Sequence, residues 1–248
     1  MFVVVDNMET LSNEQLEKYY NSISLKEIGE KGQLKLLNSS VLVVGAGGLG
    51  SASLLQLASM GIGHIGVIDN DVVKLRNLPR QIIYQYDDVN KNKVLTVKKR
   101  LKRINPDVEV KTYNYLLDES NARRIIKKYD IVLDCTDNFE TKFLINDTCI
   151  KLHKPFVTAG VSDYKGQVMT VIPDKTKDFK SLFSELPINI DEKYKDDDGV
   201  FPFAVSIISL IASSEVTKYL LDIHSLLTDQ MLVMDTLNME FKKYKFSQ

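Results

Sequence analysis

A glycine-rich turn follows directly on a run of apolar, mostly β-branched residues. The stretch reads Val41-Leu-Val-Val-Gly45-Ala-Gly47-Gly48-Leu49-Gly50, which contains the spacing G-x-G-x-x-G, and a helix-compatible sequence follows from Ser51 to Met60. A strand, a tight glycine turn and a helix N-terminus together bind anions, because backbone N–H groups and the positive end of the helix dipole face the ligand. The pattern predicts that Gly45, Gly47, Gly48 and Gly50 hold the phosphates of an adenine nucleotide.

A second apolar segment, Ile65-Gly-Val-Ile-Asp69, ends on a carboxylate that is placed to accept a hydrogen bond from a ribose hydroxyl. These features fit NAD as well as ATP. Arg80 and Lys93 favour ATP, because a guanidinium clamps two phosphate oxygens and a lysine supplies a compact positive charge. Asp137 follows the buried run Ile131-Val-Leu-Asp134, where it can hold the Mg²⁺ that a nucleoside triphosphate brings. Hydride transfer requires neither this metal nor these cations.

Strand-like and helix-like segments alternate through the first two thirds of the chain. We expect strands at 41–44, 65–68, 108–112, 131–134 and 156–158, and helices from about 49, around 94–104, near 121–128 and over about 140–152. Such an alternation is typical of an α/β protein. It predicts a Rossmann-like, mostly parallel sheet with helices on both faces.

The rhythm changes after residue 165. We expect a strand at 167–172, a long loop or flexible crossover at 174–199, a buried helix at about 203–221, and antiparallel strands near 231–234 and 239–246, the latter at an exposed edge. A capping box from Ser12 to Gln15 predicts a short helix within an N-terminal helical arm, residues 1–40. The sequence contains no internal repeat, so we expect a single domain over 1–248.

The composition is that of an ordinary globular domain, with 44% hydrophobic and 26% charged residues among 248. A formal net charge of −1 gives no support to nucleic-acid binding, which would need a clear basic excess. The two cysteines form no C-x-x-C pair and the three histidines have no spacing typical of metal ligands. With only two cysteines, the chain is expected in a reducing cytoplasm. Neither a secretory signal nor a membrane span is expected, because the N-terminus lacks a basic start and the apolar stretch 203–212 is about half a span.

Together the motifs resemble the ThiF/MoeB/HesA family, the bacterial and archaeal relatives of ubiquitin-activating enzymes. Eight pieces occur in the family order from about residue 25 to residue 240. They are Gly29-Glu-Lys-Gly-Gln33, Gly45-Ala-Gly-Gly-Leu-Gly50, Asp69-Asn-Asp71, Asn77-Leu-Pro-Arg80-Gln81, Lys93, Ile104-Asn-Pro106, Asp134-Cys-Thr-Asp137-Asn138 and Gly166-Gln167. Each piece alone is unspecific, but eight in order with suitable spacing indicate the family.

The resemblance implies an ATP- and Mg²⁺-dependent adenylyltransferase. Its commonest substrate in the family is the C-terminal glycine of a ubiquitin-like sulfur-carrier protein for thiamine or molybdopterin biosynthesis. Arg80 and Lys93 would stabilise the α-phosphate transition state and the departing pyrophosphate, and Asp137 would organise the metal. The implied nucleotide-binding positions are Gly45, Gly47, Gly48, Gly50, Asp69, Asp71, Asn77, Gln81 and Thr136. A homodimer is expected from the resemblance and from the apolar helix at 203–221, with no membrane or nucleic-acid partner.

The sequence departs from the family pattern at its arm and at its cysteines. Relatives begin with R-Y-x-R-Q, whose second arginine enters the partner subunit's nucleotide site, whereas Ser22 stands at that position here. Asp178 and Ser181 replace the first of two C-x-x-C zinc pairs, and a reactive cysteine near the long loop gives way to the acidic run 196–198. Zinc binding and transfer through a cysteine are therefore not expected.

These departures leave three alternatives open. The substrate could be a peptide or a small-molecule carboxylate in cofactor or natural-product biosynthesis, the chain could be a non-catalytic nucleotide-binding subunit, or it could be an NAD dehydrogenase. Around the site, Asp134 could orient its neighbours instead of binding metal, Arg76 could be a surface residue, and Cys135 is expected in the core.

Overall fold

The computed structural model describes residues 8–184 and 199–246. Its strands form one sheet of eight within these residues. The strands are β1 Ser40–Val44, β2 His64–Ile68, β3 Glu109–Tyr113, β4 Ile131–Asp134, β5 Phe156–Ser162, β6 Lys165–Val171, β7 Gln230–Asp235 and β8 Glu240–Lys245. The helices are α1 Asn13–Lys18, α2 Tyr20–Ile23, α3 Gly29–Leu37, α4 Gly48–Ser59, α5 Lys93–Ile104, α6 Ala122–Ile126, α7 Phe139–Lys151, α8 Phe179–Ser184 and α10 Pro202–Leu220, with 3-10 turns at Leu75–Asn77 and Tyr86–Asp88.

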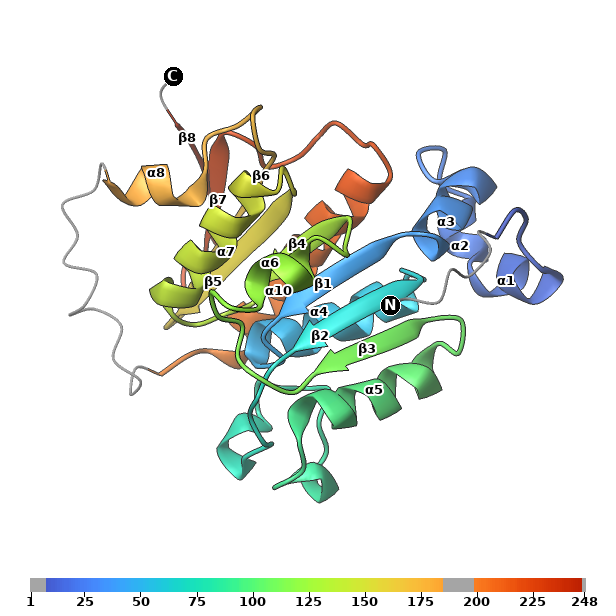
Figure 1. The fold of residues 1–248 in the computed structure, drawn as a ribbon, viewed down its shortest axis with the longest axis horizontal. Coiled ribbons are helices and arrows are strands. Elements are labelled where there is room, and N and C mark those ends of the chain that lie inside the picture. The colour runs from blue at the N-terminus through green and yellow to red at the C-terminus, as the bar shows by residue number, and fades with distance from the viewer. Residues whose placement is uncertain (1–7, 185–198, 247–248) are drawn as a thin grey trace.

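The sheet order is β3-β2-β1-β4-β5-β6-β7-β8, and the first five strands of this order run parallel. Strands β6, β7 and β8 then add antiparallel pairs. The chain leaves β1 toward β2 on one side and returns to β4 on the other, so the order reverses at β1 (Figure 1). Ligands of open α/β sheets bind outside the carboxyl ends of the strands at such a reversal. The predicted fold class is confirmed.

Helices cover both faces of the sheet, as expected. In Figure 1, α6 and α7 lie on the near face, while α4 and α10 lie behind the sheet and α5 runs below β3. Alternate residues of the five parallel strands enter two separate apolar clusters, one with α4, α5 and α10 and the other with α6, α7 and α8. In β1, for example, Val41 and Val43 face the first cluster and Leu42 and Val44 the second. Burial on both faces explains why these strands are continuously apolar.

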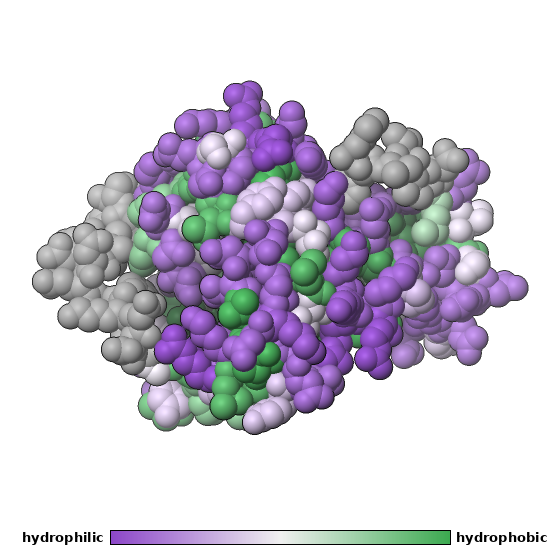
Figure 2. All heavy atoms as spheres, turned by 60° about the horizontal axis from the view of Figure 1, so that its bottom comes forward, coloured by the Kyte–Doolittle hydropathy of each residue, from purple (hydrophilic) through white to green (hydrophobic). Residues whose placement is uncertain are grey.

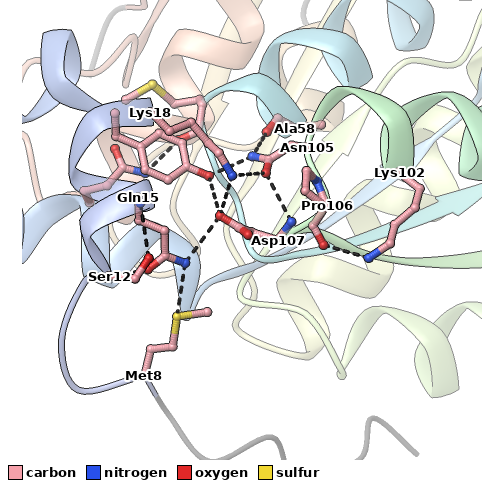
Figure 3. A network of polar contacts seen from close by, with 12 residues as sticks. Met8, Ser12, Gln15, Lys18, Ala58, Lys102, Asn105, Pro106 and Asp107 are labelled. Atoms are coloured by element: carbon pink, nitrogen blue, oxygen red, sulfur yellow. Dashed lines mark hydrogen bonds and ion pairs between the residues drawn. The ribbon is translucent and has the colours of Figure 1, made fainter.

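The N-terminal arm contacts the end of the sheet at which the parallel strands begin. The amide of Gly63 donates to Leu36 at 3.0 Å, just before β2. Asn105 links the arm to the end of α4, because its side-chain amide donates to the Tyr19 hydroxyl at 2.7 Å and to the carbonyl of Ala58 at 2.8 Å. An ion pair of 2.9 Å between Lys18 and Asp107 completes this network (Figure 3). The motif at 104–106 therefore has a structural role far from the glycine turn.

The predicted capping box is present, since the Ser12 hydroxyl accepts from the Gln15 amide at 3.2 Å and the Gln15 side chain accepts from Ser12 at 3.0 Å. Ser22, where relatives carry an arginine, lies in α2 against the Met60 sulfur at 3.7 Å. The arm of this chain therefore presents no cation at position 22.

The region after β6 differs from the sequence prediction. A loop was expected from 174 to 199, but Phe179–Ser184 form helix α8, while 185–198 lie outside the described residues. Tertiary contacts explain the difference, because the Phe179 ring stacks on Phe139 with centroids 6.4 Å apart and the Phe179 amide donates to Asn146 at 3.0 Å. Neither contact is visible in a local pattern.

Helix α10 is long and apolar enough to cross a membrane, yet half of its most apolar window is buried against the rest of the fold. It packs on α4, β5 and β6, as predicted for a core helix. Strand β8 is exposed along its whole length, as expected for the sheet edge. Figure 2 shows a surface on which hydrophilic side chains predominate and apolar ones occur in separate patches.

Candidate active site

Three loops meet at the carboxyl ends of neighbouring strands. The glycine turn follows β1, which pairs with β2 on one side and β4 on the other. Asp69 follows β2, and Asp137 lies three residues beyond the end of β4. The turn is joined to both sides, because Ala46 donates to the Asp69 carboxylate at 2.8 Å and Gly45 lies against the backbone of Cys135. The sheet thus places the predicted phosphate, ribose and metal positions side by side.

The glycine turn leaves no room for side chains at its ends. Gly45 has φ +93°, a left-handed conformation that favours glycine, and an added Cβ would lie 2.8 Å from the carbonyl oxygen of Cys135. A Cβ on Gly50 would lie only 2.0 Å from the carbonyl oxygen of Gly45. Helix α4 begins at Gly48 with no side-chain cap. Its first N–H groups are therefore available to an anion such as a phosphate.

Asp69 is fixed by two backbone amides. One carboxylate oxygen accepts from Ala46 and the other from Asp71, each at 2.8 Å. A carboxylate offers about four lone-pair positions. Asp69 can therefore hold the glycine turn and still accept hydrogen bonds from a ribose.

Lys93 begins helix α5 and reaches the same acidic residues. Its ammonium lies 2.8 Å from Asp71 and 3.8 Å from Asp69, with 5% of the side chain exposed. Asp71 is half-exposed, at 54%. Lys93 is therefore a nearly buried cation on the Asp69 side of the site, held in place by a carboxylate that solvent or a ligand can reach.

The segment from Asn77 to Tyr84 lies next to the glycine turn. The aliphatic part of the Arg80 side chain lies 3.7 Å from where a Cβ on Gly48 would stand, and its guanidinium donates to the carbonyl of Arg76 at 3.2 Å. Gln81 is 4% exposed, its amide nitrogen lies 3.7 Å from the corresponding position on Gly47, and its Oε1 has no hydrogen-bond partner among the described residues. Buried amide oxygens are normally satisfied, so this atom indicates a place for a ligand donor.

The side chains of Asn77 and Thr136 bond to their own loops, so their contribution to nucleotide binding is less direct than that of the glycine turn. The Asn77 oxygen accepts from the amide of Lys74 at 3.0 Å, which caps its own 3-10 turn. Thr136 donates to Asp134 through its amide at 3.0 Å and its hydroxyl at 2.6 Å. Both side chains hold the loops on which nucleotide-binding residues were predicted.

Asp134 is a buried organising group. Besides Thr136, its carboxylate accepts from Thr158 at 2.7 Å and from the Lys142 ammonium at 3.0 Å. Lys142 also donates to the carbonyl of Ala159 at 2.8 Å, so one ion pair joins β4, β5 and α7. Of the two interpretations of Asp134, the orienting one agrees with these contacts, because four donors already occupy the carboxylate.

Asp137, by contrast, is exposed at the start of α7. Its carboxylate accepts a hydrogen bond of 3.5 Å from the side chain of Asn138, and Asn138 caps α7 by accepting from Thr141 at 2.9 Å. No group of three or more His, Cys, Asp or Glu side chains gathers in the described part of the chain. Mg²⁺ needs no such group when phosphates and waters complete its shell, so a single carboxylate here is sufficient.

Replacing Asp134 by Asn is expected to lower the free energy of unfolding by about 3 to 5 kcal/mol, because the Lys142 ammonium is left buried without its carboxylate. The double variant Asp134→Asn/Lys142→Met removes both charges and should recover most of that loss. Urea unfolding followed by circular dichroism measures both values. Equal losses in the single and double variants would show that the ion pair is not the source of the stability.

Both cysteines are free and buried. Burial, with the neighbouring Asp134 carboxylate, raises the pKa of the Cys135 thiol to about 12. At neutral pH the thiol is therefore uncharged and a poor nucleophile. Cys135 is a core residue, as the sequence predicted.

Sequence reasoning missed Ser51, Tyr84 and Lys142. Each supports the site through a partner that the sequence does not reveal: Ser51 accepts from the amide of Ile83 at 2.8 Å, and Tyr84 donates to Ala46 at 2.8 Å. A tyrosine within an apolar run is a weak signal, since a buried hydroxyl usually finds a partner.

The comparisons with known proteins agree with this architecture. A model described as the ThiF family matches residues 19–248. The chain is 35% identical to the "Sulfur carrier protein adenylyltransferase" of Thermus thermophilus over 237 residues, covering 94% of this chain and 88% of that protein. It is also 35% identical to the "Probable molybdopterin-synthase adenylyltransferase" of Porphyra purpurea, covering 95% of this chain but 62% of that protein.

Solved structures show the same fold at lower identity. A structure of E. coli MccB with ATP superposes with a TM-score of 0.79 at 20% identity, over 98% of this chain and 73% of that one. The PaaA structure gives 0.82 at 23% identity, over 100% and 78%.

Proposed function

This chain belongs to the ThiF family, and from that membership and the site geometry we propose that it is an ATP-dependent adenylyltransferase that activates a carboxylate. The observation that carries the proposal is the uncapped start of α4 with Arg80 beside Gly48. Unpaired N–H groups bind phosphate, and a cation beside them offsets the charge that develops during phosphoryl transfer. The chain spans 62% of the Porphyra relative, so the activity is inferred for this domain.

In the proposed reaction, an oxygen of the acid attacks the α-phosphorus of ATP in line with the bond to the β-phosphate. A new P–O bond forms as that bond breaks, which gives an acyl-adenylate and pyrophosphate. No side-chain nucleophile is required, so the protein contributes positioning and electrostatic stabilisation. Arg80 would offset charge on the transferring and leaving phosphates, Lys93 would act from the Asp69 side, and Asp69 would hold the ribose.

The residues present fit a magnesium ion bound with the triphosphate. Asp137 offers an exposed carboxylate three residues beyond the end of β4, whereas the Asp134 carboxylate is already occupied by donors from the protein. When bound, the ion would neutralise charge on the phosphate oxygens. We propose no zinc site, since Asp178, which directly precedes α8, accepts from the Ser181 amide at 2.7 Å.

We propose that the substrate is the C-terminal glycine of a ubiquitin-like sulfur-carrier protein. Relatives named "Sulfur carrier protein adenylyltransferase" and "SAMP-activating enzyme E1", each 35% identical to this chain, support this choice. The alternative of a peptide or small carboxylate keeps one supporting observation, namely that the arm lacks a cation at Ser22. We also propose a homodimer in the cytoplasm, because the C-terminal strands expose apolar side chains and both cysteines are free thiols.

Exchange of labelled pyrophosphate into ATP tests the function. We expect exchange with a carrier protein ending in Gly-Gly and none with the same carrier lacking its last glycine. Exchange with a short peptide or small acid alone would favour the alternative substrate. ATP binding without exchange for any carboxylate would favour a non-catalytic subunit, and tight NADH binding without competition by ATP would overturn the nucleotide assignment.

The homodimer has its own measurement. Sedimentation velocity at micromolar concentration should give the mass of two chains. A monomer of 28.2 kDa under these conditions would contradict the assembly without affecting the proposed reaction.

A further inference from the structure

The Arg80 segment is held to the glycine turn by two side-chain hydrogen bonds that are separate from the proposed catalytic groups. The Tyr84 hydroxyl donates to the carbonyl of Ala46 at 2.8 Å, and the Ser51 hydroxyl accepts from the amide of Ile83 at 2.8 Å. Tyr84 is 5% exposed and Ser51 is fully buried. We propose that Tyr84 and Ser51 are positioning residues that set the orientation of the glycine turn and the place of Arg80. This inference rests on the proposed adenylyl transfer.

Tyr84 fixes one peptide unit of the turn. The amide of Ala46 is held by Asp69 and its carbonyl by Tyr84, both at 2.8 Å, so side chains hold this residue on both sides. In a trans peptide the carbonyl of Ala46 and the amide of Gly47 point in opposite directions. Holding the carbonyl toward Tyr84 therefore aims the N–H of Gly47, the residue before α4, away from Tyr84.

The Tyr84 and Ser51 contacts also restrict the position of the backbone that carries Arg80. Turn hydrogen bonds connect the amides of Arg80 and Gln81 to Asn77, and the amide of Tyr84 to Gln81. The Tyr84 and Ser51 contacts attach the far end of this short segment to the turn and to α4. Within residues 8–184 and 199–246 the guanidinium donates to Arg76 alone, so the backbone anchors largely set where the Arg80 side chain lies beside Gly48.

The Tyr84 hydroxyl remains a donor over the working pH range. Burial, followed by the charges of Asp69, Asp71 and Asp88, raises its pKa. The hydroxyl stays protonated, so the contact with Ala46 persists.

Steady-state pyrophosphate exchange tests Tyr84→Phe, which removes one oxygen atom. We expect kcat to fall at least tenfold with the KM for ATP within twofold of wild type, because misplacement of catalytic groups affects the transition state more than binding. The matched control is Tyr129→Phe. Tyr129 is also buried, its hydroxyl bonds Tyr113 at 3.0 Å, and it packs in the opposite apolar cluster, so this variant should keep wild-type kcat.

Hydrogen exchange of the ligand-free protein supplies a second measurement. In Tyr84→Phe the amides of residues 46–50 should exchange faster, whereas Tyr129→Phe should leave them unchanged. If Tyr84→Phe fails to fold, Ser51→Ala replaces it, with Ser53→Ala as its control because Ser53 is a buried serine of α4 that bonds Ser209 instead.

The outcomes separate this inference from the proposed function. If the wild-type protein shows no pyrophosphate exchange, the proposed function is wrong. The hydrogen-exchange comparison would still decide whether Tyr84 holds the turn. If wild type catalyses pyrophosphate exchange and the kcat of Tyr84→Phe or Ser51→Ala stays within twofold of wild type, the positioning role is wrong. Equal losses of kcat in Tyr84→Phe and Tyr129→Phe would also overturn it, since they would reflect general destabilisation.

Discussion

Asp137→Asn should reduce pyrophosphate exchange by about 100-fold or more while leaving the protein folded. The carboxylate is exposed three residues beyond the end of β4, and removing its charge would weaken its hold on the Mg²⁺ that offsets the charge of the triphosphate; by analogy with other charge-stabilising groups this loss is about 10²–10³. Its contacts are minor, so the melting temperature should stay within about 2 °C of wild type, as is usual for surface substitutions. Exchange assays over a range of Mg²⁺ concentrations and thermal unfolding measure the two effects.

Glu140→Gln is the matched control. Glu140 is an exposed acid in the first turn of α7, three residues after Asp137, so this variant also removes one negative charge near the site. It should keep activity within about threefold of wild type. Equal losses in both variants would assign the effect to overall charge, and wild-type activity in Asp137→Asn would remove Asp137 from the proposed site.

Arg80→Ala should lower kcat by about 100-fold or more, because it removes the cation beside the start of α4. Arg80→Lys should recover only part of the rate, since an ammonium cannot replace a planar guanidinium that contacts two oxygens. Both can be measured by the same exchange assay, with ATP binding by calorimetry to separate affinity from rate.

The control for Arg80 is Arg76→Ala. Arg76 is exposed, and it contacts Arg80 through its backbone carbonyl, which the substitution keeps. Its activity should therefore be close to that of wild type. A similar loss at both positions would show that the site depends on the general basic charge of this segment, and the specific role of Arg80 would be wrong.

The sequence predicted the parallel part of the fold well because its signals are local. Apolar runs such as 41–44 and 131–134 form β1 and β4, and the turn that joins β1 to α4 has no room for a side chain at Gly45 or Gly50. Helix α8 was missed for the opposite reason. It depends on Phe179 stacking against Phe139 and on Asn146 accepting from the start of the helix, and both partners are more than thirty residues away.

The candidate site could be predicted in the same uneven way. The glycines, Asp69 and Asp137 follow from their positions at strand ends, and the structure brings them to one edge of the sheet. The Lys142 ammonium and the Tyr84 hydroxyl were missed, because their roles arise when Asp134 and Ala46 are brought to them by folding. The Gln81 oxygen without a partner is likewise visible only in three dimensions.

The reversal of strand order at β1 has a consequence for biosynthesis. Strand β1 pairs with β4 from Val41 to Val44, but its partners at 131–134 are translated about 90 residues later, or about 5 to 20 seconds at usual elongation rates. During that interval one side of a valine-rich segment has no neighbour on the nascent chain, and such open edges promote association between molecules. Slower translation between β1 and β4 is therefore expected to increase association between nascent chains.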